Sequence, residues 1–171
     1  MARVIDAVPT SFEVAPFGGQ WFAWAEIAAC FWPGRSRRAD KVNPKLAPVR
    51  ELGGVYCFAW SPQAPPLIDP KAPQVKYIGE TRSFLRRMGQ FGHSAGFWNK
   101  RQDGHSAGWR WPEGRTECAW VAFFPVGQGL LPHLASGMRH WMEAVALEEH
   151  RLANGRLPEV NEPGSGVVAF D

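Results

Sequence analysis

The sequence predicts a small α/β domain, and three features of the chain point to that class. Apolar runs rich in β-branched and aromatic residues occur at 53–61, 74–79 and 116–126, as expected for strands. The segment 132–153 carries apolar residues at helical spacing. With 171 residues, the chain is long enough for one domain with a substantial core. Strands and helices in this order form a small layered α/β fold.

Residues 1–51 are expected to form an N-terminal extension that packs on this core. In "WFAWAEIAACFW" (21–32), Trp24, Ile27, Ala28 and Phe31 recur at helical spacing, which predicts a short buried helix. The basic, turn-rich segment 33–45 that follows is typical of a loop.

The central elements follow in order. A proline-rich loop at 61–73 separates the first two strands, because proline cannot donate to a ladder. Thr81 or Ser83 can cap a helix that runs through residue 91. Residues 92–115, rich in glycine and tryptophan, are expected to be an irregular insertion. The helix 132–153 should end before Gly155 and Pro158. Its predicted buried stripe is Met138, Trp141, Val145, Leu152 and position 148.

Charge is unevenly distributed along the chain. The net charge is +3, and residues 53–112 hold eight lysines and arginines against three acidic residues. Such a concentration suits a surface that faces phosphates, although an ordinary solvated surface is the alternative. The segment 21–32 is too short to span a bilayer and contains Glu26, and no signal peptide is evident. We therefore expect a cytoplasmic protein without a membrane partner; its oligomeric state is not predicted.

The three cysteines are scattered and lack C-x-x-C spacing, which argues against a disulfide framework or a zinc site.

Five short motifs occur in a defined order over residues 52–162. The first strand begins Gly54-Val55-Tyr56, and the second carries Tyr77-Ile78-Gly79. Arg87 lies eight residues beyond Gly79, and a later helix and turn supply Glu148 and Pro158-x-x-Asn161. Together these residues resemble the GIY-YIG nuclease domain, which is found in intron homing endonucleases, the excision-repair incision subunit and some restriction enzymes.

The resemblance implies a three-stranded antiparallel sheet flanked by helices, and metal-dependent cleavage of DNA, duplex rather than single-stranded. It implies that Tyr56 accepts the proton of the attacking water, that Tyr77 orients the water or the phosphate, and that Arg87 stabilises the developing charge. Glu148 would hold one Mg²⁺ or Mn²⁺ ion, Asn161 would tie down the chain near Glu148, and Gly54 and Gly79 would support the site. A catalytically silent nucleic-acid-binding module of the same fold is the alternative.

Elementary chemistry is compatible with these roles. Tyrosines on adjacent strands can stand side by side on one sheet face. An arginine fork suits a phosphate. A carboxylate on the apolar stripe of a helix needs a partner, which a divalent ion can supply. An exposed pair, Glu148 and Glu149, without an ion is the other interpretation, and the choice between the two glutamates stays open.

The chain departs from the family pattern at two positions. The family often has tyrosine or histidine four residues after the arginine, where this chain has Phe91; His93 is expected to stand in for it, unless Phe91 simply packs and His93 is a loop residue. Glu80 follows the second motif in place of a lysine or small polar residue, which puts a catalytic role for that position in doubt.

A duplicated pentapeptide marks the insertion: "GHSAG" occurs at 92–96 and again at 104–108. A hydrolase nucleophile elbow is rejected, since it needs a strand before it and a helix after it. We expect the insertion and the helix before it to contact nucleic acid, by charge and by stacking. The candidate residues are Arg82, Arg86, Trp98, Lys100, Arg101, His105, Trp109 and Arg110, with Trp111 as a further stacking candidate. A mini-core of the tryptophans is the alternative.

Overall fold

The computed structural model describes residues 10–31, 44–95, 105–111 and 118–162, and it confirms the α/β class. A four-stranded antiparallel sheet has the order β1-β4-β2-β3. Three strands match the predicted runs: β2 (Gly54–Trp60), β3 (Val75–Thr81) and β4 (Ala119–Pro125). The fourth strand, β1 (Phe22–Ala23), corrects the expected number of three; it pairs with β4 and comes from the segment predicted to be wholly helical.

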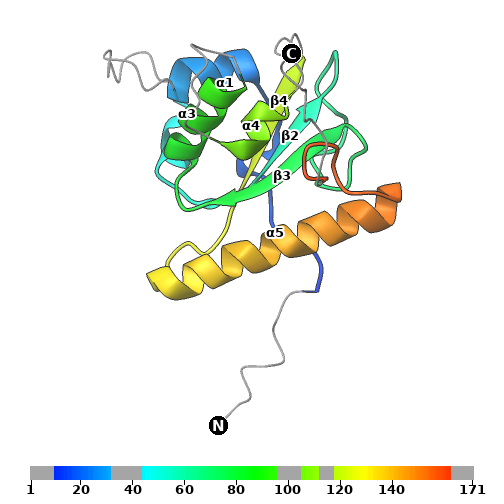
Figure 1. Ribbon diagram of the computed structural model, residues 1–171. Coiled ribbons are helices and arrows are strands. Elements are labelled where there is room, and N and C mark those ends of the chain that lie inside the picture. Colours follow the sequence, from blue (N-terminus) through cyan, green and yellow to red (C-terminus); the bar gives the residue numbers. More distant parts are fainter. Residues whose placement is uncertain (1–9, 32–43, 96–104, 112–117, 163–171) are drawn as a thin grey trace.

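Helices cover one face of the sheet in a layer of short elements (Figure 1). They are α1 (Trp24–Phe31), α2 (Ala47–Arg50), α3 (Phe84–Ser94) and α4 (Ser106–Trp109), and the 3₁₀ turn η2 (Phe17–Gly19) precedes β1. Ser83 caps α3, since its hydroxyl accepts from the Arg86 N–H at 3.3 Å. The α3 helix continues three residues past the predicted end, and α4 lies within the segment expected to be irregular.

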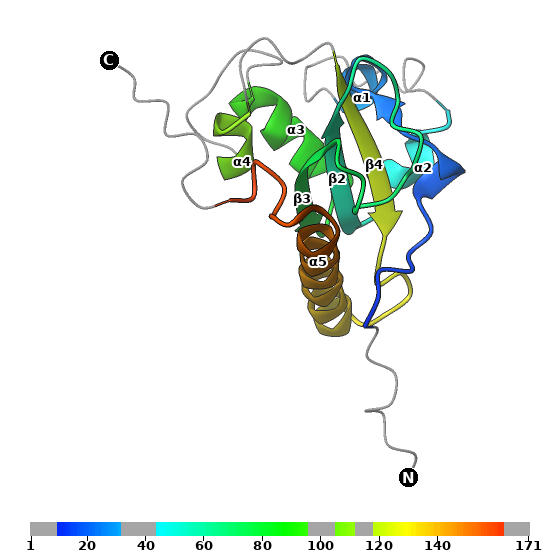
Figure 2. The same ribbon diagram turned by 90° about the vertical axis from the view of Figure 1, so that its right-hand side faces the viewer.

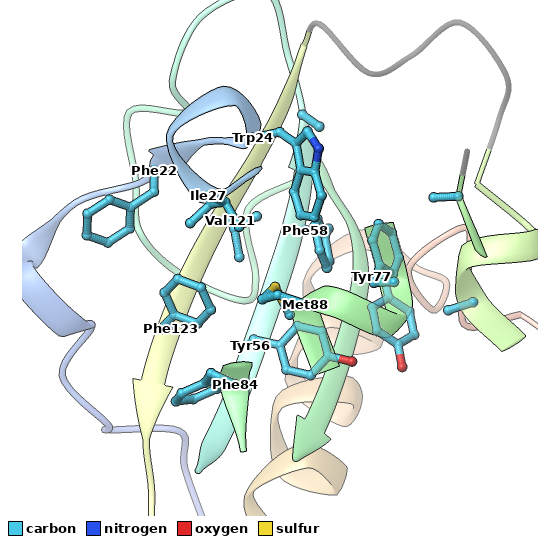
Figure 3. Close-up of a cluster of buried hydrophobic side chains, with 14 of the residues drawn as sticks. Phe22, Trp24, Ile27, Tyr56, Phe58, Tyr77, Phe84, Met88, Val121 and Phe123 are labelled. Carbon is cyan, nitrogen blue, oxygen red and sulfur yellow. The ribbon is translucent and has the colours of Figure 1, made fainter. Parts of the chain in front are cut away.

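An aromatic core fills the space between this layer and the sheet, as Figure 3 shows. Phe58 stacks on Phe91 with ring centroids 3.9 Å apart, and Trp24 and Trp111 pack against the same two rings. Phe91 therefore packs as a core residue of α3, as the alternative interpretation holds. His93, which that interpretation places in a loop, lies within the same helix.

The opposite face of the sheet packs on α5 (Pro132–Asn154), which Figure 2 shows almost end-on. The existence and length of α5 match the prediction, but the predicted phase is wrong. The buried residues are Ala135, Met142, Ala146 and His150. Met138, one member of the predicted stripe, does pack against the same core and is partly buried. Trp141, Glu148 and Leu152, which were expected on the buried stripe, are exposed. No helix in the described part of the chain combines the length and apolarity that a membrane span requires.

Strand β3 lies at one edge of the sheet, and the segment after α5 covers that edge. The Asn161 side chain accepts from the Ile78 N–H and donates to the Ile78 carbonyl, both at 2.8 Å. Val160 N–H donates to the Lys76 carbonyl at 2.8 Å. Asn161 thus anchors the chain as expected, but it does so on β3 and not beside Glu148. The candidate site lies beside this covered edge of β3.

The described part of the insertion divides its tryptophans between two roles. Trp111 is buried in the aromatic core, so the expectation that it stacks on bases is wrong and the mini-core interpretation holds for it. Trp109 is 53% exposed on α4, and Trp98 lies outside the described residues.

This division predicts that the two tryptophans differ in their effect on stability. Trp111→Ala should lower the free energy of unfolding by about 3–5 kcal/mol, because it empties a packed aromatic site. Trp109→Ala should change it by less than about 0.5 kcal/mol, since the ring is largely in solvent. Urea unfolding of both variants beside the wild type measures the difference. Equal losses of unfolding free energy in the two variants would contradict the assignment of Trp111 to the core and of Trp109 to the surface.

Candidate functional site

Two tyrosine hydroxyls converge above Gly79 on the helix-covered face of the sheet (Figure 3). Tyr56 on β2 pairs with Gly79 on β3, and Tyr77 lies two residues earlier on β3. The tyrosine ring centroids are 5.8 Å apart. A Cβ at position 79 would lie 2.6 Å from the Tyr77 hydroxyl and 2.8 Å from that of Tyr56, so glycine is what allows the two hydroxyls to meet. The prediction that these tyrosines share a face is confirmed.

Position 54 requires glycine for a different structural reason. Its backbone approaches β4 so closely that a Cβ would collide with the carbonyl of Phe124. The glycine therefore permits β2 and β4 to stay paired at the start of β2, two residues before Tyr56.

His105 is the third member of the cluster, and its position corrects the expectation that it faces a phosphate backbone. The residue is buried, and its Nε2 lies 2.7 Å from the Tyr56 hydroxyl and 3.4 Å from that of Tyr77. His105 Nδ1 accepts from the Ala107 N–H at 3.0 Å, and so caps α4. Burial, followed by the charges of Arg87 and Arg110, lowers the His105 pKa to about 3.

These contacts define the direction of the hydrogen bonds. A neutral imidazole has one proton, and because Nδ1 accepts, that proton lies on Nε2. His105 therefore donates to the Tyr56 oxygen and cannot take a proton from it at Nε2. The two tyrosine side chains also interact with one another, and each affects the pKa of the other. His105 thus donates into this pair of phenols, of which Tyr77 is the more exposed.

Burial dominates the ionisation of both tyrosines. It raises the Tyr56 pKa well above the ordinary value, and the nearby Tyr77 adds to this while Arg87 opposes it. Burial also raises the pKa of Tyr77 to about 12, although the hydrogen bond from Tyr56 acts in the other direction. Both side chains are therefore neutral phenols near neutral pH, and either one needs added positive charge to act as a base.

Arg87 on α3 supplies positive charge beside this cluster, as predicted. Its charge lowers the pKa values of Tyr56, Tyr77, His105 and Glu143, which places it within electrostatic reach of all four. The Arg87 Nε is buried and has no hydrogen-bond partner among the described residues. A guanidinium in this condition is suited to an anion that arrives from outside the chain.

The carboxylate at the site is Glu143, which is not among the residues predicted from the sequence pattern. Glu143 lies on α5, and its Oε1 accepts from the Glu80 N–H at 3.1 Å, so the side chain reaches the edge of β3 one residue beyond Gly79. Burial, followed by the charge of Glu80, raises the Glu143 pKa. Its neighbour Glu80 pairs with Arg139 and His140 of α5, at 3.3 and 3.5 Å, which is a structural role for that position.

Glu148 does not lie on the buried side of α5, contrary to prediction. It is exposed and pairs with Arg151 one turn later at 2.6 Å, and this hydrogen bond lowers the Glu148 pKa. Glu149, the other candidate, accepts from the Phe12 N–H at 3.0 Å and lies 3.8 Å from Lys71. Glu143 differs from Glu148 and Glu149 in its position around the helix. It lies five residues before Glu148, and its side chain points toward the sheet. Glu143 can be identified as the site carboxylate only when the face of α5 that packs on the sheet is known.

The duplicated pentapeptides pack against one another. Ser94 of the first copy accepts from the His105 N–H of the second at 2.7 Å and donates to the Gln90 carbonyl at 3.0 Å. Ala95 and Ala107 are both buried in the aromatic core. The second copy thereby delivers His105 to the tyrosines, in place of the predicted His93, which is half-buried near the end of α3.

The other predicted contact residues are partly described. Arg82 and Arg86 are exposed at the start of α3. Arg110 follows α4; its charge acts on Tyr77 and His105, and its guanidinium donates to the Glu162 carbonyl at 3.2 Å. Lys100 and Arg101, like Trp98, lie outside the described residues.

Comparison with known proteins identifies no relative: no family model, curated protein or solved structure matches the chain significantly. Within the described ranges, no three or more His, Cys, Asp or Glu side chains form a cluster that could hold a metal ion. A cation at this site would therefore depend on one carboxylate together with water and substrate. Mg²⁺ is commonly bound in this way, through one or two carboxylates and substrate phosphates.

The buried, neutral His105 predicts a specific pH dependence of stability. The unfolded chain protonates this residue near pH 6.5, whereas the folded protein does so only near pH 3. Because the unfolded state binds more protons in between, the free energy of unfolding should fall as the pH drops below 6.5. His105→Asn keeps a capping acceptor but cannot titrate, so it should lose about 2 kcal/mol less than the wild type between pH 7 and pH 5.

Denaturant unfolding of both proteins at the two pH values provides the measurement. The titrations of Glu143 and His150 are common to both proteins and cancel in the difference. If the free energy of unfolding falls equally in the wild type and in His105→Asn, the predicted lowering of the His105 pKa in the folded state is wrong.

Proposed function

We propose that this protein is a metal-dependent endonuclease of the GIY-YIG type that hydrolyses phosphodiester bonds of DNA. The observation that carries the proposal is the convergence of Tyr56, Tyr77, Arg87 and a carboxylate at one edge of the sheet. Two of these residues lie in the paired motifs, and Arg87 has the spacing that the resemblance requires. The sheet of the proposed type would comprise β2, β3 and β4, with β1 as an addition.

Each side chain has a role that phosphodiester hydrolysis requires. Arg87 would bind the phosphate and offset the charge that develops on its oxygens, which is a large contribution in a site screened from water. The tyrosine pair would take the proton of the attacking water, with Tyr56 as the base. An ionised Tyr56 would face two donors, the Nε2–H of His105 and, after rotation of its hydroxyl, Tyr77. Water would reach the pair on the side of Tyr77, since Tyr56 has no exposed surface.

Glu143 would hold the divalent ion, Mg²⁺ or Mn²⁺, in place of the predicted Glu148. Its burial and the neighbouring charge of Glu80 destabilise the ionised carboxylate, and a bound cation would relieve both effects. When bound, such an ion supplies positive charge for the transferring phosphoryl group and for the leaving oxygen. The chain itself fixes where that charge can sit, because the Glu80 N–H orients the carboxylate.

Contacts with DNA outside the reacting phosphate would come from the exposed residues beside the site. Arg82 lies just before α3 and Arg86 within it, both ahead of Arg87, and Trp109 offers an exposed ring for stacking four residues after His105. A catalytically silent DNA-binding module is the second candidate, favoured by the full burial of Tyr56. Nicking of a supercoiled plasmid with Mg²⁺, but not with chelator, separates the two.

Removing only the hydroxyl of Tyr56 tests the base. Tyr56→Phe should lower the cleavage rate by about 10²–10⁴-fold, the usual contribution of a general base. The fold should persist, since the lost hydrogen bonds to His105 and Tyr77 cost about 1–3 kcal/mol, a fraction of the stability of a typical domain. Plasmid nicking and thermal unfolding are measured on the same preparation. Wild-type cleavage by this variant would exclude Tyr56 as the base.

Two isosteric substitutions on α5 identify the metal ligand. Glu143→Gln should abolish Mg²⁺-dependent cleavage while DNA binding in chelator is retained, because an amide is a poor ligand for a hard cation. Glu148→Gln is the matched control on the exposed face and should cleave normally. Cleavage lost in Glu148→Gln but kept in Glu143→Gln would show that Glu148 is the metal ligand and exclude Glu143.

A further inference from the structure

Glu80 on β3 is bonded to α5 through both its backbone and its side chain. Its backbone N–H donates to the Glu143 carboxylate at 3.1 Å. Its own carboxylate accepts from the Nε of Arg139 at 3.3 Å, and Arg139 precedes Glu143 by four residues, which is about one helical turn. A single residue of the strand therefore fixes two successive turns of α5 relative to the sheet.

The side chains of Glu80 and Arg139 are largely shielded from water. They are 18% and 11% exposed, whereas His140, which lies 3.5 Å from the Glu80 carboxylate, is 64% exposed. Charges in such surroundings are weakly screened. The charge of Glu80 accordingly acts on its neighbour: after burial, it is the largest cause of the raised Glu143 pKa.

The two carboxylates of this contact are unequally compensated. Glu80 is paired with Arg139 and His140, whereas Glu143 has no ion-pair partner among the described residues. The charges of His140 and Arg87 act on Glu143 from nearby, and each has a smaller effect than Glu80. Neighbouring carboxylates repel one another, and a cation bound beside them relieves the repulsion. The contact therefore favours a cation at Glu143 more than a lone carboxylate would.

We propose that Glu80 is a positioning residue for the divalent cation at Glu143, and that the charge of its side chain raises the affinity of the site for that ion. The inference rests on the proposed function, since it concerns the cation assigned there to Glu143. It adds a second acidic residue to a site with one carboxylate ligand. Residues that act behind a metal ligand commonly change the affinity by about 10–100-fold.

Mn²⁺ binding to the full chain without DNA tests this role independently of cleavage. Electron paramagnetic resonance of free Mn²⁺ gives the dissociation constant, and the binding that Glu143→Gln removes is assigned to the site. Glu80→Gln keeps the backbone N–H and the shape of the side chain but loses the charge, so the dissociation constant should rise about tenfold or more. Glu80→Asp keeps the charge and should stay within about threefold of the wild type.

A purely structural role of Glu80 predicts the reverse order. If Glu80 only fastened α5 to β3, Glu80→Gln would be the milder change, because its amide oxygen can still accept from Arg139 while the shorter aspartate cannot reach as far. Thermal unfolding of both variants measures that structural contribution separately. Glu159→Gln is the matched control and should bind Mn²⁺ like the wild type. It also removes a carboxylate paired with β3, at Lys76, which lies four residues before Glu80.

Three results would overturn the inference. Unchanged Mn²⁺ affinity in Glu80→Gln, or weaker binding in Glu80→Asp than in Glu80→Gln, would overturn it and leave Glu143 as the metal ligand. Absence of Glu143-dependent Mn²⁺ binding at millimolar concentrations would overturn it together with that ligand assignment. Plasmid nicking by the same preparations is recorded separately, so failure of the inference and failure of the nuclease proposal are distinguishable.

Discussion

The geometry of the candidate site depends on Gly79 having no side chain. Because Gly79 has no Cβ, two phenol rings from neighbouring strands can bring their hydroxyls together over the backbone of β3. The other members of the cluster are arranged around that point: His105 donates into it, Arg87 lies beside it, and Glu143 bonds to the next N–H along the strand. Strand pairing sets the relative heights of the tyrosines, since Tyr56 lies directly opposite the glycine. The chemistry of the site therefore follows from the register of two strands.

The features that the sequence predicts correctly are those that local pattern controls. The three apolar runs became strands β2, β3 and β4, and Ser83 caps α3, because strand runs and caps need little knowledge of the rest of the chain. The shared face of Tyr56 and Tyr77 follows from strand alternation. Arg87 lies one turn into the capped helix, so its position was also accessible from sequence.

The features that the sequence predicts wrongly depend on tertiary packing. The side of α5 that carries Leu134, Trp141 and Leu152 is exposed. The buried side is formed by Ala135, Met142, Ala146 and His150, with Met138 and Leu147 partly buried against the same core. Alanine and histidine contribute little to a hydrophobic pattern, so the pattern identified the wrong face and led to Glu148 in place of Glu143. His105 was misplaced for a related reason: only the packing of α4 on α3 through Ser94 brings it to the tyrosines. Strand β1 was missed because two residues are too few to show alternation.

The closure of the β3 edge has a consequence for the behaviour of the protein in solution. An exposed edge strand presents unused donors and acceptors on which foreign chains can add as further strands. Here Asn161 occupies both groups of Ile78, Val160 occupies the Lys76 carbonyl, and Glu143 takes the Glu80 N–H. Asn161, Val160 and Glu143, which lie beside the candidate site, therefore also protect the β3 edge against edge-to-edge aggregation. Changes to this short segment carry a cost in solubility that is separate from any effect on chemistry.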